Sequence, residues 1–395
     1  MSRFESYIEN MKNTYNLLFA LLRKEICGET FSADIQNVTA EQYLNLYRIS
    51  KSHDIAHIVG DALYSLNVGL ETEIKSKFQK AQMMAMYRCA QMNYELEQLC
   101  TVFEKAKISF MPLKGSIIRK YYAKPEMRTS CDIDIYVKES DLENATSMLI
   151  SELGYKLGQK NIYDVSFYAN TGVHIELHFA LTEHDKKVDK VLETIWDTAT
   201  KADETEYHYI MSNEMFLLYH IAHVAKHFVY GGCGIRPFMD LWVAKNKMGY
   251  DIVKVKKLLQ ECGLGVFGEA VLLLSDVWFS NSQHTEVTKE MELYIVDAGS
   301  YGTMENKVAI SQAKKGGRLK YALGRIFQSY PMLKIYYPRL EKYPILFPYY
   351  QVKRWCRILF TKDKKRAFAE LKYNSSVSEE KKKRLATLCN DLELL

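Results

Sequence analysis

Three short segments between Met111 and Ala180 decide the fold: Leu113-Lys114-Gly115-Ser116, Cys131-Asp132-Ile133-Asp134-Ile135 and His174-Ile175-Glu176-Leu177-His178. The first contains the glycine and serine of a turn that can hold a phosphate group. The other two alternate polar and apolar residues, which is the pattern of β-strands with one buried face. We therefore expect one phosphate-binding turn and two strands that carry carboxylates.

The second segment places two carboxylates on the same face of a strand. Asp132 and Asp134 are two residues apart, so their side chains point to the same side, while Ile133 and Ile135 point to the other. Neighbouring aspartates are poor strand formers and repel each other, and a cation would relieve that repulsion. The alternative is a polar face that simply meets water. The pair favours a divalent-metal site.

A β-hairpin is predicted around the third segment. Residues 163–169 and 173–179 have strand character and flank a turn at 170–172 that contains asparagine and glycine. Glu176 lies on the polar face of the second strand, between two histidines. If this strand neighbours the strand with the aspartate pair, Glu176 becomes the third carboxylate of a site for Mg²⁺ or Mn²⁺.

The first segment has the order strand, glycine turn and helix. Residues 108–113 form a short apolar run, and a helix through residues 117–122 is expected after the turn. In such a turn Gly115 lets the backbone approach an anion, and the Ser116 hydroxyl adds a donor. An ordinary strand-to-helix turn is the alternative.

Helical periodicity dominates the remainder of the chain. Residues 74–103 keep a helical period without proline or glycine, which predicts one long helix. Its methionines are expected to fill gaps in the core; they are Met83, Met84, Met86 and Met92.

A helix over residues 214–230 carries a row of histidines. His220, His223 and His227 are three and four residues apart and share one face. Arg236 and Asp240 follow on the next expected helix. Two interpretations stay open: this region closes over a nucleotide, or it forms a buried histidine row with an ion pair between Arg236 and Asp240.

Composition limits the class of protein. The chain has 395 residues, of which 48% are hydrophobic and 26% charged, so it can build more than one folded region and is not disordered. A net charge of +5 suits an acidic ligand but is too small for a dedicated nucleic-acid binder. The eight cysteines are scattered without a Cys-x-x-Cys pair, which argues against a zinc or disulfide framework. With neither a signal peptide nor an apolar run of membrane-spanning length, a cytoplasmic protein is expected.

The three segments together resemble a known family, the bacterial uncharacterised nucleotidyltransferases of the nucleotidyltransferase-fold superfamily, which is DNA polymerase beta-like. The resemblance lies in a Leu-Lys-Gly turn at residues 113–115, an Arg-x-x-x-Asp-x-Asp strand at 128–134 and a His-x-Glu-x-His strand at 174–178, and it extends to the histidines, Arg236 and Asp240. It implies that Gly115 and Ser116 hold nucleotide phosphates.

The resemblance also implies roles for the other candidate residues. The catalytic and metal-binding carboxylates are Asp132, Asp134 and Glu176. The nucleotide-binding candidates are Lys114, Gly115, Ser116, Arg128, His223, His227, Arg236 and Asp240. Arg128 would neutralise a phosphate oxygen, or it would pair with Glu126 or Asp132 at the surface.

Residues 318–360 are rich in basic and aromatic side chains. Such a segment can stack on bases, lie on an anionic membrane, contact a polyanionic carrier or pack as a cap on the helical region, and packing is the favoured interpretation.

The predicted fold class is α+β and predominantly helical, with a small mixed β-sheet nucleotidyltransferase core and flanking helices. Four regions are expected: a helical N-terminal region (1–104), the nucleotidyltransferase core (105–205), a helical domain (206–300) and a basic, aromatic helical C-terminal region (301–395).

The predicted activity transfers a nucleoside monophosphate from ATP or another NTP to a hydroxyl or phosphate of an unknown acceptor, which is a small molecule, saccharide, RNA or protein. The alternatives are a nucleotide-binding scaffold without turnover and a toxin-like transferase acting on RNA or protein.

Overall fold

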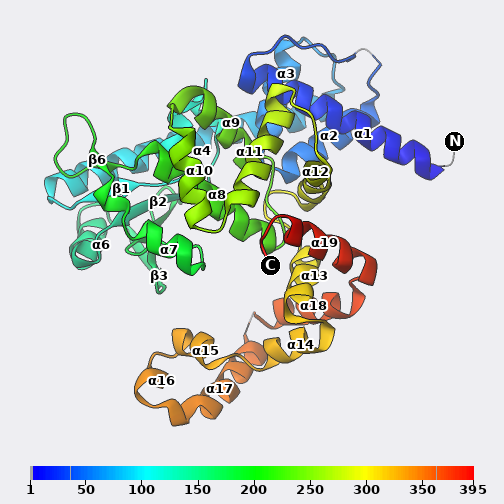
Figure 1. Ribbon diagram of the computed structural model, residues 1–395. Helices are drawn as coiled ribbons and strands as arrows, with labels where there is room; N and C mark the ends of the chain where they lie inside the picture. Colours follow the sequence, from blue (N-terminus) through cyan, green and yellow to red (C-terminus); the bar gives the residue numbers. More distant parts are fainter. Residues whose placement is uncertain (1–2, 36, 362) are drawn as a thin grey trace. The chain divides into compact units, whose positions relative to one another are not determined.

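The computed structural model describes residues 3–35, 37–361 and 363–395 and divides into two compact units. The first unit contains Met1–Val224 and Ile235–Lys289, and the second contains Ala225–Gly234 and Glu290–Leu395. Figure 1 shows a mainly helical chain with a small sheet, which confirms the predicted fold class. The four regions expected from the sequence remain a prediction.

A five-stranded mixed sheet lies in the first unit, with strand order β1-β2-β5-β4-β3. Its strands are β1 (Phe110–Pro112), β2 (Asp132–Val137), β3 (Lys156–Lys160), β4 (Asp164–Tyr168) and β5 (His174–His178). β2 and β5 are parallel and the other neighbours are antiparallel, and β4 and β5 form the predicted hairpin. A separate pair consists of β6 (Thr200–Lys201) and β7 (Tyr209–Ile210).

The alternation in β2 and β5 assigns one face of the sheet to the core. Ile133, Ile135 and Val137 of β2 are buried in one cluster with Ile175 and Leu177 of β5. Two helices complete this cluster, α4 (Thr72–Lys105) and α6 (Leu142–Ser151). The apolar residues thus bury one face, and the charged residues of both strands are left together on the other.

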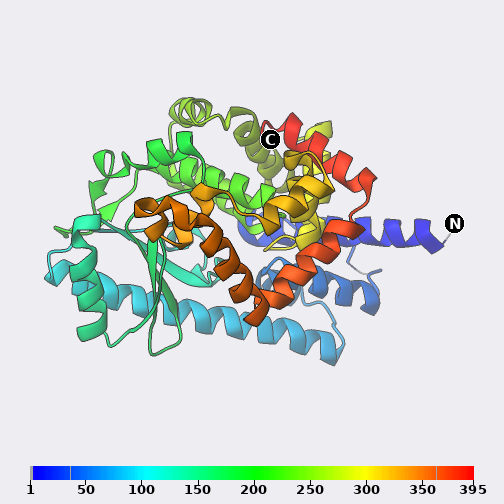
Figure 2. The same ribbon diagram turned by 90° about the horizontal axis from the view of Figure 1, so that it is seen from below.

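Helix α4 is the predicted long helix, and Figure 2 shows it running past the sheet without a break. The prediction for its methionines is wrong for three of the four. Met92 is buried, but Met83, Met84 and Met86 are exposed, because the helix contacts the core along one side only. An amphipathic helix packs on the core along one side, and these three methionines lie outside that side.

The first unit contains further α-helices. They are α1 (Arg3–Leu22), α2 (Ala40–Ser52), α3 (Ala56–Ser65), α5 (Gly115–Ile118), α7 (Lys186–Leu192), α9 (Arg236–Val243), α10 (Ile252–Glu261) and α11 (Gly265–Ser280). The boundary between the units falls inside two further helices, α8 (Asn213–Val229) and α12 (Glu286–Ala298).

The second unit contains helices joined by turns, and no strand is found among its described residues. It contains α13 (Met304–Lys315), α14 (Arg318–Ile326), α15 (Tyr330–Tyr336), α16 (Arg339–Lys342), α17 (Phe347–Phe360), α18 (Asp363–Ser376) and α19 (Glu379–Asp391). α13 packs against α18 and α19, and a small core of Leu333, Leu340 and Tyr350 joins α15, α16 and α17. Within the described residues, no helix is both long enough and apolar enough to cross a membrane.

Candidate metal and nucleotide site

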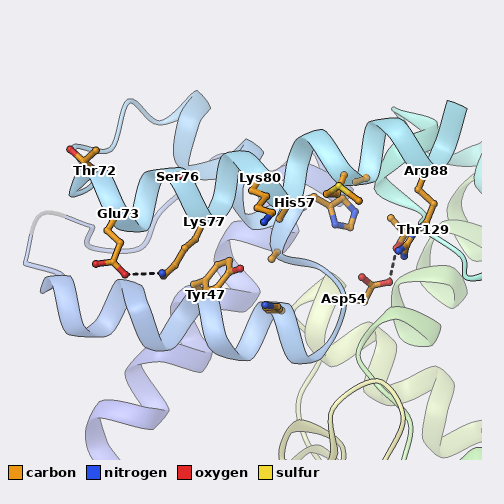
Figure 3. A pocket seen from close by; sticks show the side chains of 15 residues that line it. Tyr47, Asp54, His57, Thr72, Glu73, Ser76, Lys77, Lys80, Arg88 and Thr129 are labelled. Atoms are coloured by element: carbon orange, nitrogen blue, oxygen red, sulfur yellow. Dashed lines mark hydrogen bonds and ion pairs between the residues drawn. The ribbon is translucent and has the colours of Figure 1, made fainter. Parts of the chain in front are cut away.

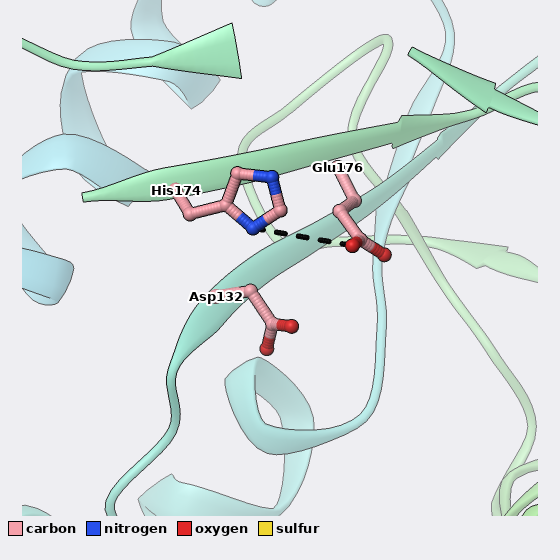
Figure 4. A group of neighbouring side chains, drawn as sticks. All are labelled: Asp132, His174 and Glu176. Atoms are coloured by element: carbon pink, nitrogen blue, oxygen red, sulfur yellow. Dashed lines mark ion pairs between the residues drawn. The ribbon is translucent and has the colours of Figure 1, made fainter. Parts of the chain in front are cut away.

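The parallel pairing of β2 and β5 sets the register of the candidate site. Asp132 pairs with His174, and Asp134 pairs with Glu176. Because side chains at paired positions of neighbouring strands point to the same face, the three predicted carboxylates and both histidines of β5 lie on the face opposite the core. Figure 4 shows Asp132, His174 and Glu176 on this face.

Two groups of potential metal ligands result from this register. Asp132, His174 and Glu176 each offer one ligand atom, and these atoms lie within 4.8 Å of one another. Asp134, Glu176 and His178 form a second group by the same measure. The predicted trio of carboxylates is therefore divided between two groups that share Glu176, and each group includes a histidine.

The first group fits a divalent ion. Ligand atoms about 2.1 Å from Mg²⁺ lie up to about 4.2 Å apart, so a small side-chain movement completes the arrangement. Carboxylate oxygens suit Mg²⁺ and Mn²⁺, and imidazole suits the later transition metals. His174 presents its Nδ1 atom to this group, 3.9 Å from Glu176 Oε1 (Figure 4).

The second group already contains a cation. Lys114 Nζ lies 2.8 Å from Asp134 Oδ1, and His178 Nε2 lies 2.9 Å from the same oxygen. Burial alone would raise the pKa of Asp134, but Lys114 and His178 hold it well below its usual range. Asp134 is therefore a carboxylate stabilised by the chain's own residues.

Asp132 and Glu176 have the opposite electrostatic environment. Burial raises the pKa of Asp132, and the nearby charge of Asp134 raises it further. Burial also raises the pKa of Glu176, with additional repulsion from Asp134 and Asp132. Both groups thus retain a net repulsion that a bound cation would relieve.

The turn before α5 brings Lys114 to these carboxylates. Lys114 has φ +46° and ψ −115°, the values of the first central residue of a type II′ turn, which glycine usually occupies. The Ser116 N–H donates to the Leu113 carbonyl across the turn, and the Leu113 N–H donates to the Asp134 carbonyl. A lysine in this conformation carries roughly 1–3 kcal/mol of strain, which the surrounding contacts must offset.

The helix after the turn is shorter than predicted. α5 ends at Ile118, and a 3₁₀ helix continues over Arg119–Tyr121. Tyr122 is extended, and its hydroxyl donates to Asp240 at 2.7 Å. This contact with a distant part of the chain draws Tyr122 out of the helix.

Gly115 is required by a close approach within the protein. A Cβ atom at this position would lie 2.3 Å from the Ser130 hydroxyl, which accepts a hydrogen bond from Arg119. We expect Gly115→Ala to lower the free energy of unfolding by about 1–3 kcal/mol, as measured by urea denaturation.

Two controls accompany this prediction. Gly69→Ala should be nearly neutral, because a Cβ atom there meets nothing within 4 Å. In a Ser130→Ala background the remaining contact of Gly115→Ala is an ordinary 3.5 Å, so most of its cost should disappear. Equal costs of Gly115→Ala in both backgrounds would contradict the steric explanation.

Arg128 and Asp240 form a buried ion pair. Arg128 Nε lies 2.8 and 2.9 Å from the two carboxylate oxygens of Asp240, and Asp240 is fully buried. Arg236 contacts Asp54 at 2.6 Å. Neither expected alternative partner of Arg128 is used, and Arg236 and Asp240 do not pair with each other. The first pair connects the chain before β2 to α9, and the second connects α9 to the loop between α2 and α3.

The histidines of α8 have different surroundings. His220 is packed against Phe216, and its Nε2 lies 3.0 Å from the Pro237 carbonyl oxygen, while burial lowers its pKa. His223 Nδ1 lies 3.0 Å from Glu183 Oε1. His227 belongs to the second unit, so its role in nucleotide binding stays a prediction.

Several residues of the site were missed by sequence reasoning. Tyr219 is buried on α8 and interacts electrostatically with Lys114, Asp134 and Glu176, while burial raises its pKa. Glu183 is buried beside His223. The sequence placed His178 on the same strand face as Glu176 but assigned it no role in the site. Nothing in the local pattern pointed to Tyr219 or Glu183.

A hollow of about 900 Å³ opens in the first unit between α2, α3 and α4 (Figure 3). It is lined by Tyr47, Lys51, Asp54, Ala56, His57, Thr72, Glu73, Ser76, Lys77, Lys80, Ala81, Met84, Ala85, Arg88 and Thr129. Of its two acidic side chains, Glu73 pairs with Lys77 and Asp54 with Arg236. The side chains that line the hollow therefore carry an excess of positive charge.

Thr129 connects this hollow to the candidate site. Its side chain lines the hollow and donates to Asp54 at 2.9 Å. Asp132 follows three residues later, so at most about 11 Å separates the Cα atoms of the two residues. The Thr129 end of the hollow therefore lies near β2, and the other end reaches Thr72 on α4.

Comparison with known proteins identifies the family of the chain. A family model described as uncharacterised nucleotidyltransferase matches residues 39–280. The match covers more than half of the chain and includes the whole sheet, so the chain belongs to this nucleotidyltransferase family. Neither the curated proteins nor the solved structures contain a match.

Proposed function

We propose that this protein is a cytoplasmic, metal-dependent nucleotidyltransferase that moves a nucleoside monophosphate from an NTP to a hydroxyl or phosphate of an acceptor. The observation that carries the proposal is the pair of ligand groups that share Glu176 on adjacent parallel strands. Family membership supports a nucleotidyl-transfer role. Mg²⁺ or Mn²⁺ is the proposed cofactor.

The reaction exchanges one phosphorus–oxygen bond for another. An acceptor oxygen attacks the α-phosphorus of the NTP, the bond to the β-phosphate oxygen breaks, and pyrophosphate leaves. When bound, divalent ions supply charge neutralisation at the phosphates and lower the pKa of the attacking group. We propose Asp132 and Glu176, with His174, as the residues that hold the first ion, and Asp134 as a ligand of a second.

Residues of the chain perform the remaining tasks. We propose that Glu176 or Asp134 accepts the proton of an acceptor hydroxyl through a carboxylate oxygen that does not hold an ion. Lys114 is proposed to move from Asp134 toward the triphosphate, beside Gly115 and Ser116, as negative charge enters the site.

The basic hollow beside Thr129 is the proposed location of an anionic group of the acceptor. Its volume accommodates a small phosphorylated molecule, and its excess of basic side chains suits a phosphate. Acceptors that carry a phosphate are therefore the first to be screened.

The test of this function is incubation of the purified protein with each of the four NTPs, labelled at the α-phosphate, in Mg²⁺ or Mn²⁺. We expect pyrophosphate release and transfer of label to an acceptor or to the protein itself, and loss of both in EDTA. NTP binding without either product, across the screened acceptors, would favour a nucleotide-binding scaffold. Label transfer to RNA or protein would identify the acceptor class of a toxin-like transferase.

A further inference from the structure

Helix α17 carries an exposed apolar stripe on one side. Ile345 in the turn before the helix, then Tyr349, Val352, Cys356 and Leu359, recur at intervals of four, three, four and three residues. Within α17 this spacing aligns Tyr349, Val352, Cys356 and Leu359 along one face, and Ile345 precedes them in a 3₁₀ helix over Pro344–Leu346. All five are exposed, and Ile345 at one end is 86% exposed. Phe360, next to the other end, is equally exposed.

The stripe is separate from the face that α17 uses for its own packing. Tyr350 is buried against Leu333 and Leu340 in the small core of the second unit, and it stacks on Tyr337 with a ring-centroid distance of 4.6 Å. The unit is therefore held together by other residues of α17. The stripe adds nothing to that core, although exposing it to water is unfavourable.

The end of α14 contacts α17 through Trp355. The indole N–H of Trp355 donates to the Ile326 carbonyl at 2.7 Å, and the Trp355 ring packs edge-on against Phe327. Leu319 and Leu323 precede Ile326 at helical spacing and are exposed, as is Ile326. The apolar side chains of α14 and α17 thus belong to one part of the second unit.

Positive charge surrounds these apolar side chains. Residues 318–360 contain nine lysines and arginines and one glutamate, whereas the whole chain has a net charge of only +5. Lys353 lies over the rings of Tyr337 and Tyr350, and Arg357 lies over the ring of Tyr336. Such cations keep their charged ends near water while their stems cover apolar surface.

Aliphatic side chains, aromatic rings and cations together match one type of partner. An anionic bilayer accepts aliphatic side chains among its acyl chains, aromatic rings at the interface and lysine or arginine at the headgroups. RNA would use the cations and rings but would gain little from Ile345, Val352 and Leu359. A second copy of the stripe would bring like charges together and repel.

We propose that the surface formed by α14 and α17 binds the face of an anionic phospholipid bilayer, with the stripe of α17 inserted at the level of the acyl chains near the headgroups. The proposal is independent of the transferase activity. The interpretation favoured from sequence was that residues 318–360 only pack against the helical region. Packing accounts for the buried side chains Tyr321, Leu333, Leu340 and Tyr350, but it does not account for the exposed stripe.

The test is co-sedimentation of the full-length protein with vesicles of phosphatidylcholine alone or with roughly 30 mol% phosphatidylserine. We expect binding to the anionic vesicles, weaker binding to the neutral ones, and partial release in about 0.5 M NaCl. The double variant Ile345→Ser/Phe360→Ser should lower the partition coefficient about tenfold or more. Because both side chains are 86% exposed, this variant should keep the wild-type circular dichroism and melting temperature.

The matched control is Tyr64→Ser/Val253→Ser, which removes two exposed apolar side chains from the first unit and should bind vesicles as the wild type does. Failure of the wild type to bind anionic vesicles would overturn the proposal. Equal binding by Ile345→Ser/Phe360→Ser would also overturn it, as would RNA binding or self-association in place of vesicle binding.

Discussion

Replacing Asp132 by asparagine should reduce nucleotidyl transfer about a thousandfold without lowering the stability of the metal-free protein. A bound ion contributes several kcal/mol of charge stabilisation in the transition state, and ~4 kcal/mol corresponds to about a thousandfold in rate. Glu176→Gln should have the same effect, because Glu176 belongs to both ligand groups.

The stability expectation follows from the direction of the pKa shifts. A carboxyl group whose pKa is raised on folding is harder to ionise in the folded chain than in the unfolded chain, so its charge lowers stability at neutral pH. Burial and repulsion raise the pKa values of Asp132 and Glu176 in this way. Removing either charge should leave the free energy of unfolding unchanged or higher, as measured in urea with EDTA present.

Asp134→Asn is the informative comparison for these two variants. Folding lowers the pKa of Asp134, so its charge stabilises the folded state above the unfolded pKa, and that stability is lost as pH falls. Removing the charge also leaves Lys114 without its counter-ion, at a cost of about 1.5–3 kcal/mol. This variant should therefore lose both activity and stability.

Divalent ions provide the second measurement. Mg²⁺ or Mn²⁺ should raise the melting temperature of the wild type by binding the folded state, and should raise it much less in Asp132→Asn and Glu176→Gln. Unchanged label transfer by either variant would refute the assignment of these carboxylates. An identical response to metal in the wild type and both variants would refute the metal site.

Asp240→Ala should be among the most destabilising single substitutions in the first unit. The side chain of Arg128 is only 11% exposed, and the substitution leaves its guanidinium without a counter-ion. The substitution also removes the hydrogen-bond acceptor of the Tyr122 hydroxyl. Breaking one partner of a buried ion pair costs roughly 3–5 kcal/mol. This is a large fraction of a typical stability of about 5–15 kcal/mol, and urea denaturation measures it directly.

Two controls separate this loss from a general effect of removing charge. Glu269→Ala breaks an exposed pair with Lys256 and should cost less than about 1 kcal/mol. In Arg128→Met/Asp240→Ala both charges are absent, so the double variant should be more stable than Asp240→Ala alone. A stable Asp240→Ala variant that fails to bind NTP would instead support direct nucleotide contact by Asp240.

Local pattern predicted the elements of the core well. The alternation in residues 132–137 and 174–178 predicted two strands with one apolar face each, and the turn at 170–172 predicted their hairpin neighbour. These features depend on side-chain periodicity, which is visible within a few residues. The same periodicity misplaced three methionines of α4, because it cannot tell how much of a helix the core covers.

Long-range partners were beyond the reach of such patterns. Arg128 pairs with Asp240, 112 residues away, and Lys114 pairs with Asp134 across a turn whose lysine has a positive φ. His223 of α8 meets Glu183, which lies in the loop before α7. Each of these contacts depends on how separate elements pack against each other. The spacing of residues along the chain does not predict that packing.

The sequence by itself therefore determined a carboxylate-bearing pair of strands, a lysine–glycine turn and a mainly helical setting. Only the tertiary structure decided that β2 and β5 are parallel neighbours, with Asp134 beside Glu176, and that two histidines divide the carboxylates into two ligand groups. The physical reason is that strand periodicity determines which face a side chain occupies. The register between strands, which determines what that side chain meets, arises from burying both apolar faces in one core.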